Sequence, residues 1–316
     1  MNCDMPLRRM QDVQVRGAVG TVEDVKRKLN TDELLRKEAD GTRVNVFIVD
    51  TGIHKESLLP QAQPNYHLWP GPWQARQDSG HANYVAFDVL IAAPRAHLYD
   101  YPLLAVTEAG HEAFLTSATH AFRDILDALR NDPNLKPAVV VNCWGAPTDG
   151  DAPPGRPENY SHNENHPLNE AVRDLGQIAD VIFAAGNDGI GSGNNILGVN
   201  SHPDALCVAA AMVNDELLNT SSHGPGALYR QEPDITGFSN FQAGNRLHTA
   251  TSTACPVVAG VVAAFRSTRT GRNLTPAEMK DHLLKSARKV NGINGWNRAF
   301  GHGIINASKA LDSILN

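Results

Sequence analysis

Short runs of β-branched residues alternate with stretches of helical periodicity along most of this chain, and this alternation limits the folds open to it. The runs are residues 44–49, 96–101, 138–142, 181–185 and 205–213. Between them, residues 113–130 and 168–178 carry apolar side chains at the spacing of a helix with one buried face. Strands that alternate with helices form parallel sheets covered on both faces. We therefore predict an α/β fold with a mostly parallel twisted sheet between two layers of helices.

Composition and charge exclude several classes of function. The chain has 316 residues, 41% of them hydrophobic, which is enough for a substantial core. Its formal net charge of −6 gives no electrostatic reason to expect a nucleic-acid or anionic-membrane partner. The longest apolar stretch, residues 206–213, is far shorter than the roughly 20 residues of a spanning helix. Because residues 1–10 also lack the apolar segment of a secretion signal, we expect a cytoplasmic protein.

The chain shows no internal repeat or flexible linker after residue 40, so we expect one domain of the size of a catalytic domain over residues 21–316. Residues 1–20 form an N-terminal extension, and residues 21–39 are predicted to be a helix. Residues 146–167 are polar and rich in Pro and Gly, which is typical of a surface insertion. The four cysteines have no CxxC spacing, and we expect free thiols.

Two candidate catalytic residues follow predicted strands or open predicted helices. Asp50 comes directly after the strand at residues 44–49, at the edge of a parallel sheet where ligands and catalytic groups gather. His81 follows Gly80 and begins an apolar segment that we predict to be a helix. Each residue alone also fits an ordinary structural role, since an Asp at a strand end and a lone His are common.

The segment 249–265 is the most informative part of the chain. Its length and Pro256 favour a buried helix with Pro256 in the first turn, which places Ser252 at the helix N-terminus. Free backbone N–H groups there would stabilise an oxyanion formed on a group attacked by Ser252, although Ser is also a common N-cap. Asn187 follows the strand at residues 181–185 and offers a side-chain amide for the same oxyanion. The nearby glycines at 189, 191 and 193 lack the full GxGxxG pattern, which argues against dinucleotide binding.

Taken together, four motifs in this order resemble those of the subtilisin-like serine peptidases, the subtilases. They are Asp50-Thr-Gly, Gly80-His81, Ala184-Ala-Gly-Asn187 and the run from Thr251-Ser252 through Pro256 to Gly260. The resemblance covers about residues 35–312. The order Asp, His, Ser is the one known for subtilisin.

The resemblance implies a three-layer subtilisin-like fold and a serine endopeptidase acting on polypeptides through an acyl-enzyme. It implies that Asp50, His81 and Ser252 are the catalytic triad and that Asn187 is the oxyanion donor. It also implies two walls of a peptide-binding cleft. The residues of these walls are Cys143, Trp144 and Gly145 on one side and Ala184, Ala185 and Gly186 on the other.

Some features depart from the family or stay open. After His81 the chain reads Ala-Asn-Tyr-Val-Ala-Phe, where the family usually has Gly-Thr-His-Val-Ala-Gly, so a catalytically impaired binding or regulatory protein is the alternative reading. Residues 1–20 are too few for a folded prodomain, and one hypothesis is that they block the cleft until cleaved. The insertion at 146–167 is an exosite for basic side chains, a metal site or a plain solvated loop. We expect no cofactor in the chemistry, assign no metal ligands, and leave calcium binding and the oligomeric state open.

Overall fold

A seven-stranded parallel sheet forms the centre of the protein. The computed structural model describes residues 5, 7–9, 17–70, 80–104, 113–146, 152–189, 196–290, 292 and 294–316. The strand order is β3-β4-β2-β5-β7-β8-β9, with every neighbouring pair parallel. The strands are β2 (Asn45–Val49), β3 (Tyr66–Leu68), β4 (His97–Tyr101), β5 (Ala138–Asn142), β7 (Asp180–Ala184), β8 (Leu206–Met212) and β9 (Ile235–Ser239). The predicted α/β fold class is confirmed, with two strands, β3 and β9, that the sequence analysis missed.

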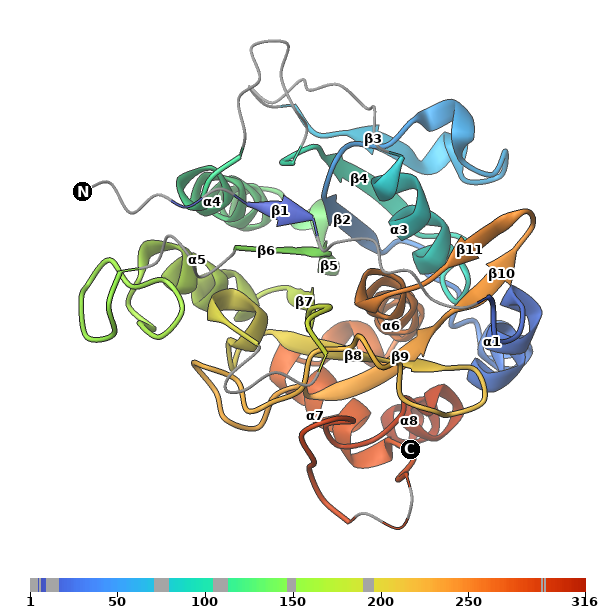
Figure 1. The fold of residues 1–316 in the computed structure, drawn as a ribbon. Helices are drawn as coiled ribbons and strands as arrows, with labels where there is room; N and C mark the ends of the chain where they lie inside the picture. The colour runs from blue at the N-terminus through green and yellow to red at the C-terminus, as the bar shows by residue number, and fades with distance from the viewer. Residues whose placement is uncertain are drawn as a thin grey trace.

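Helices cover both faces of this sheet, and alternate residues of one strand belong to the two resulting cores (Figure 1). Val46 and Ile48 of β2 pack in one core, and Phe47 packs in the other. The first core includes α3 (His81–Leu90), α6 (Thr251–Ser267), α7 (Pro276–Ser286) and α8 (Ala307–Leu315), and the second includes α4 (Leu115–Asn131) and α5 (Pro167–Gly176). Because both faces of the sheet are covered, residues 46–49 of β2 are all apolar, whereas a strand with one exposed face would alternate apolar and polar residues.

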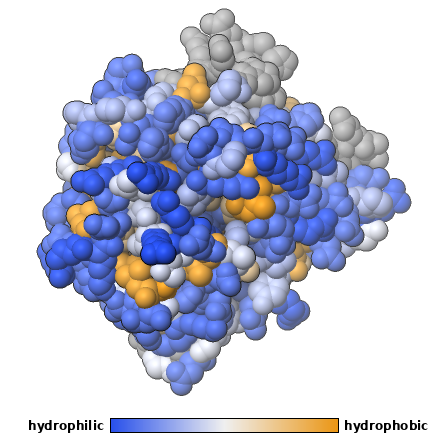
Figure 2. Space-filling model, turned by 180° about the vertical axis from the view of Figure 1, so that it is seen from behind, coloured by the Kyte–Doolittle hydropathy of each residue, from blue (hydrophilic) through white to orange (hydrophobic). Residues whose placement is uncertain are grey.

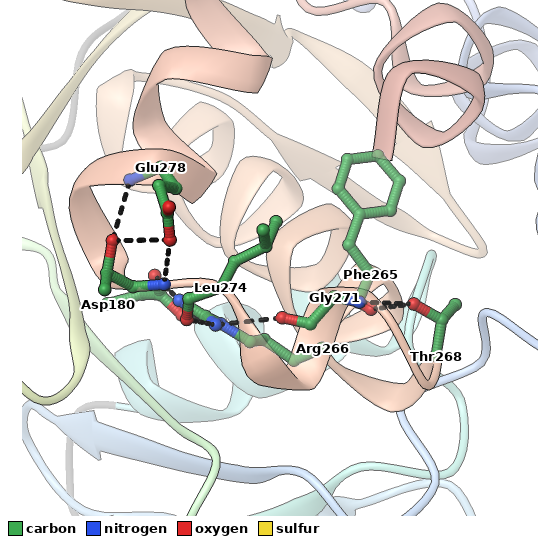
Figure 3. Close-up of polar contacts among 8 residues, drawn as sticks. Asp180, Phe265, Arg266, Thr268, Gly271, Leu274 and Glu278 are labelled. Atoms are coloured by element: carbon green, nitrogen blue, oxygen red, sulfur yellow. Dashed lines mark hydrogen bonds and ion pairs between the residues drawn. The ribbon is translucent and has the colours of Figure 1, made fainter. Parts of the chain in front are cut away.

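The helix α6 crosses the first core and is anchored at its far end by Arg266. The guanidinium group of this buried arginine donates to both carboxylate oxygens of Asp180, at 2.6 and 2.7 Å, and to the carbonyl oxygens of Gly271, at 2.9 Å, and Leu274 (Figure 3). Near the middle of the helix, a Cβ at Gly260 would lie 2.2 Å from the carbonyl oxygen of Val89 in α3. These contacts fix α6 against both the sheet and α3.

The N-terminal helical region departs from the sequence prediction. Residues 21–39 form two helices, α1 (Val22–Leu29) and α2 (Thr31–Arg36), in place of the single predicted helix. The break falls at Asn30, whose φ of 55° is in the left-handed region that ends a helix and that Asn tolerates better than most residues.

Among the described residues, the remaining regular structure consists of two small antiparallel sheets and five short 3₁₀ helices. One sheet pairs β1 (Arg8–Arg9) with β6 (Trp144–Gly145), and the other pairs β10 (Phe241–Ala243) with β11 (Arg246–His248). The 3₁₀ helices are η1 (Lys55–Ser57), η2 (Gln63–Asn65), η3 (Pro133–Leu135), η4 (Gly198–Ser201) and η5 (Gly271–Asn273).

The surface is mostly hydrophilic on the face shown in Figure 2, with small separate hydrophobic groups. Within the described part of the chain, no helix is both long and apolar enough to span a membrane. Cys143, Cys207 and Cys255 are buried free thiols, which confirms the prediction for these three, and Cys3 lies outside the described residues.

Candidate active site

Asp50 and His81 meet at the carboxyl edge of the sheet. Asp50 directly follows β2, and His81 is the first residue of α3, after Gly80 in the left-handed region with a φ of 65°. Oδ1 of Asp50 lies 2.7 Å from Nδ1 of His81 and also accepts a hydrogen bond from the Thr51 N–H. A carboxylate oxygen can only accept, so this contact places the proton on Nδ1 and leaves Nε2 as the basic nitrogen.

Ser252 is the second residue of α6, and the chain approaches it through a strained backbone conformation. Ala250 has φ 75° and ψ 176°, a combination that is close to exclusive to glycine. The carbonyl of Ala250 accepts from the Ser239 hydroxyl at 2.8 Å, which holds this conformation to the end of β9. The Ser252 Oγ is buried and has no hydrogen-bond partner among the described residues. Catalytic hydrogen bonds are often formed only when substrate binds, so a serine in this state remains available as a nucleophile.

Asn187 is tied to the residue that precedes Ser252. Its Oδ1 accepts from the Thr251 N–H at 3.0 Å and from the Thr251 hydroxyl at 2.8 Å. Because the oxygen accepts these two hydrogen bonds, the orientation of the amide is fixed, with Nδ2 as its donor end. Gly186 has φ 111°, and a Cβ there would lie 2.7 Å from the Ser222 Oγ, so the turn that delivers Asn187 requires glycine.

Pro256 and Cys143 together determine the backbone around Ser252. The sequence analysis put Pro256 in the first helical turn, but α6 begins at Thr251 and Pro256 lies inside the helix, so that prediction was wrong. Proline has no N–H, and it therefore leaves the carbonyl of Ser252, four residues earlier, without its helical partner. The thiol of Cys143 donates to that carbonyl, with an Sγ···O distance of 3.5 Å. Burial raises the pKa of the Cys143 thiol, which keeps the proton needed for this contact.

The two predicted walls of the peptide-binding cleft are joined by a residue that the sequence analysis missed. The side-chain amide of Asn200 donates to the carbonyl of Trp144, at 3.0 Å, and to the carbonyl of Ala184, at 2.9 Å. The next residue of this wall, Ala185, donates its backbone N–H to the Val208 carbonyl at 2.9 Å. The ring of Trp144 is fully buried in the second core, so the predicted wall offers its backbone edge and not its indole. No periodic pattern marks Asn200, and nothing in the sequence singled it out.

The N-terminal segment lies between two backbone edges beside this cleft. Residues 8 and 9 pair antiparallel with residues 145 and 144 of β6. On its other side the Leu7 N–H donates to the Ala113 carbonyl at 2.7 Å, and the Leu115 N–H donates to the Met5 carbonyl at 3.0 Å. We call the space between residues 113–115 and residues 144–145 the slot. A chain in this orientation advances from Met5 toward Cys143, the neighbour of Ser252.

A second His–Asp pair lies in the core next to the site and was also missed. Nδ1 of His248 is 2.7 Å from Oδ1 of Asp88, and both side chains are buried. The imidazole is stacked on Phe241, with centroids 5.3 Å apart, and the rings of Tyr84 and Phe87 approach it from α3 at 5.0 Å. Burial raises the pKa of Asp88. The pair joins the helix of His81 to the segment that leads into Ser252.

A further carboxyl group lies near Asp50. Oδ2 of Asp100 in β4 accepts from the Ile53 N–H at 2.9 Å and from the Tyr66 hydroxyl at 3.0 Å. Burial raises the pKa of Asp100 to about 6, and the charge of Asp50 adds to this effect. Among the described residues, no group of three or more His, Cys, Asp or Glu side chains is placed to hold a metal ion.

Most of the chain matches the model of a known family. Residues 41–303 match the model of the subtilase family, peptidase S8. The chain therefore belongs to the subtilase family.

Several named proteins are similar to it. Membrane-bound transcription factor site-1 protease from Homo sapiens is 27% identical over 92% of this chain, and bacillopeptidase F from Bacillus subtilis (strain 168) is 25% identical over 58% of it. The matched regions make up 27% and 13% of those two proteins, so the chain spans about a quarter of the length of the first. The crystal structure of a lanthipeptide protease shares the fold, with a TM-score of 0.67 and 18% identity over 93% of this chain and 96% of that one.

Proposed function

We propose that this protein hydrolyses peptide bonds of polypeptide substrates through an acyl-enzyme on Ser252. The Ser252 Oγ attacks the carbonyl carbon of the scissile bond, and Nε2 of His81 takes the hydroxyl proton. Asp50 keeps the imidazole in the required tautomer and stabilises the imidazolium that forms. The observation that carries the proposal is the 2.7 Å contact between Asp50 and Nδ1 of His81, because it directs the basic nitrogen away from the carboxylate.

The developing oxyanion is stabilised by Nδ2 of Asn187 and by the backbone N–H of Ser252 in the first turn of α6. His81 then gives its proton to the leaving amine, the C–N bond breaks, and water hydrolyses the acyl-enzyme by the reverse sequence of proton transfers. All of these roles are filled by side chains and backbone groups of this chain, and the proposed chemistry needs no cofactor. The free thiols at Cys143, Cys207 and Cys255 support a reducing compartment, and we propose the cytoplasm.

We also propose that residues 1–20 are a short propeptide whose β1 segment closes the slot. A substrate bound by antiparallel pairing to β6 would need the same backbone groups that β1 uses. The burial of Met5 and Leu7, which are 2% and 6% exposed, supports this role.

Labelling with a fluorophosphonate tests the proposed nucleophile. We expect the full-length protein to be labelled, Ser252→Ala to remain unlabelled, and Ser308→Ala, on the surface helix α8, to be labelled like the parent. If the parent, Ser308→Ala and Leu7→Ala, which weakens the closed slot, are all unlabelled while circular dichroism shows native folding, the alternative of an impaired binding protein gains support.

The variant Leu7→Ala tests the propeptide. Truncation of a buried leucine costs about 2–5 kcal/mol of packing, so the closed slot should be weakened at least tenfold and labelling should accelerate. N-terminal sequencing of the active protein should show loss of residues upstream of the domain. Equal labelling rates for Leu7→Ala and the parent, with Met1 retained in the active protein, would contradict the propeptide role.

A further inference from the structure

A cavity lies at the upstream end of the slot, away from the proposed triad. It has a volume of about 860 Å³ and is formed by residues 115–123 of α4, the loop that precedes α5 and the first residue of α5. This loop is the described part of the insertion that the sequence analysis left open among three roles, with Asp149 and Asp151 outside the described residues. The residues used in the argument below are Leu115, His120, Arg123, Arg156, Glu158 and His162, all of which line the cavity.

The cavity adjoins the slot at Leu115, which belongs to both. The backbone N–H of this residue donates to the Met5 carbonyl at 3.0 Å, and the same residue lines the cavity. Because a chain in the slot runs from Met5 toward Cys143, residues upstream of the Met5 position leave the slot beside Leu115. A polypeptide substrate lying in the same direction therefore delivers its upstream segment to the mouth of the cavity.

The charge of the lining favours one class of side chain. Arg123 is exposed and forms no ion pair within the described part of the chain, whereas Arg156 lies 3.8 Å from the carboxylate of Glu158. Two guanidinium groups thus face one carboxylate, and the imidazoles of His120 and His162 add hydrogen-bond donors. One of the three readings of the insertion was an exosite for basic side chains, but the charges of the described lining residues, Arg123, Arg156 and Glu158, are positive on balance.

We propose that this cavity is a distal subsite that binds acidic side chains of the substrate, upstream of the residues held in the slot. The proposal rests on the proposed peptidase function, since it uses the slot as the path of the substrate. The subsite contains none of the residues proposed for the chemistry, and it contributes to the binding of substrate alone. Occupation of the subsite should therefore lower KM and leave kcat unchanged.

Four fluorogenic peptides test this subsite, and each contains the sequence of residues 5–12. In three of them this sequence is preceded by three Glu, three Gln or three Lys residues, and the fourth has no extension. The assays use the full chain carrying Leu7→Ala, which weakens β1 without shortening the protein. The same peptides are titrated by fluorescence anisotropy onto the full chain carrying Leu7→Ala and Ser252→Ala, so that binding is measured even where cleavage is not.

Each exposed guanidinium–carboxylate pair should lower the KM and the Kd by about two- to fivefold, with a loss of the effect at high salt. We expect the Glu-extended peptide to bind tightest, and Arg123→Gln to remove most of its advantage over the Gln-extended one. Arg130→Gln, further along α4 and outside the cavity, is the matched control and should keep the advantage.

Equal KM and Kd values for the Glu, Gln and Lys extensions would overturn the proposal, as would an advantage that persists in the Arg123→Gln/Arg156→Gln double variant. If no peptide is cleaved but the Kd values still follow the extension and Arg123, the subsite stands and the proposed peptidase function fails. Failure of the two proposals is therefore distinguishable.

Discussion

Removal of the His248 imidazole should destabilise the protein far more than neutralisation of Asp88. In His248→Leu, the Asp88 carboxylate loses its partner at 2.7 Å and is left in a fully buried position. Breaking a buried ion pair from one side costs about 3–5 kcal/mol, a large part of the stability of an ordinary domain. Asp88→Asn keeps an oxygen that accepts from Nδ1 of His248, and we expect a cost of about 1 kcal/mol.

The double variant His248→Leu/Asp88→Asn should therefore be more stable than His248→Leu alone, since an unpaired buried amide costs about 1–3 kcal/mol. The groups that act on Asp88 are His248 from the end of β11, His81 on its own helix and Thr253 from α6. Each variant is made in the Ser252→Ala background to prevent self-digestion, and the free energy of unfolding is measured by urea titration.

The pH dependence has a defined sign. Burial raises the pKa of Asp88 in the folded protein, so the folded state binds a proton more tightly than the unfolded chain does. Without the His248 imidazole, the difference between the Asp88 pKa in the folded and in the unfolded state grows. The free energy of unfolding of His248→Leu therefore falls further below that of the parent as the pH rises from about 4 to about 7. A deficit that does not change with pH, or a double variant as unstable as the sum of the two single variants, would refute the reasoning.

Three other changes have expected outcomes. Ala250→Gly should raise the free energy of unfolding by about 1 kcal/mol, because relief of a strain of about 1–3 kcal/mol exceeds the entropy cost of glycine; urea titration measures this. Cys143→Ser should keep the fluorophosphonate labelling rate and Cys143→Ala should lower it, because only serine still donates to the carbonyl that Pro256 leaves unpaired. Asp100→Asn should stabilise the protein by up to about 3 kcal/mol above pH 6 and have no effect below pH 3.8, because the raised pKa of Asp100 makes its charged form costly in the folded state; thermal unfolding at both pH values measures this.

The sequence was sufficient to predict five of the seven strands of the sheet and the places of the candidate residues, because both depend on local patterns. Asp50 and Asn187 follow strands whose apolar runs are continuous, and His81 and Ser252 lie at the starts of the helices α3 and α6. Strand ends and helix starts can be read without knowing what packs against them. The strand β3 was missed because it is short and partly exposed, so that it has no apolar run.

The polar contacts that support the site could not be predicted in the same way. Asn200, Thr251 and the His248–Asp88 pair act between segments that are far apart in sequence, and none of them repeats with a helical or strand period. A buried Asn or His is recognised only when its partners are known, because burial itself is what demands a partner. The position of Pro256 illustrates the same limit, since the donor that replaces its missing N–H is the thiol of Cys143, which lies between β5 and β6 and far away in the sequence.

The two backbone edges of the slot explain how so short a strand as β1 is held. A two-residue strand such as β1 has no sequence signal, because its apolar neighbours Met5 and Leu7 are too few to form a pattern. Its stability comes instead from two edges that the domain already provides, at residues 113–115 and 144–145. Those edges are rigid for reasons unrelated to β1, since Trp144 is buried in the second core and its carbonyl is held by Asn200. Under the proposed propeptide role, a slot that is preformed in this way lets a short tethered segment compete with substrate, because little ordering of the domain is needed for either to bind.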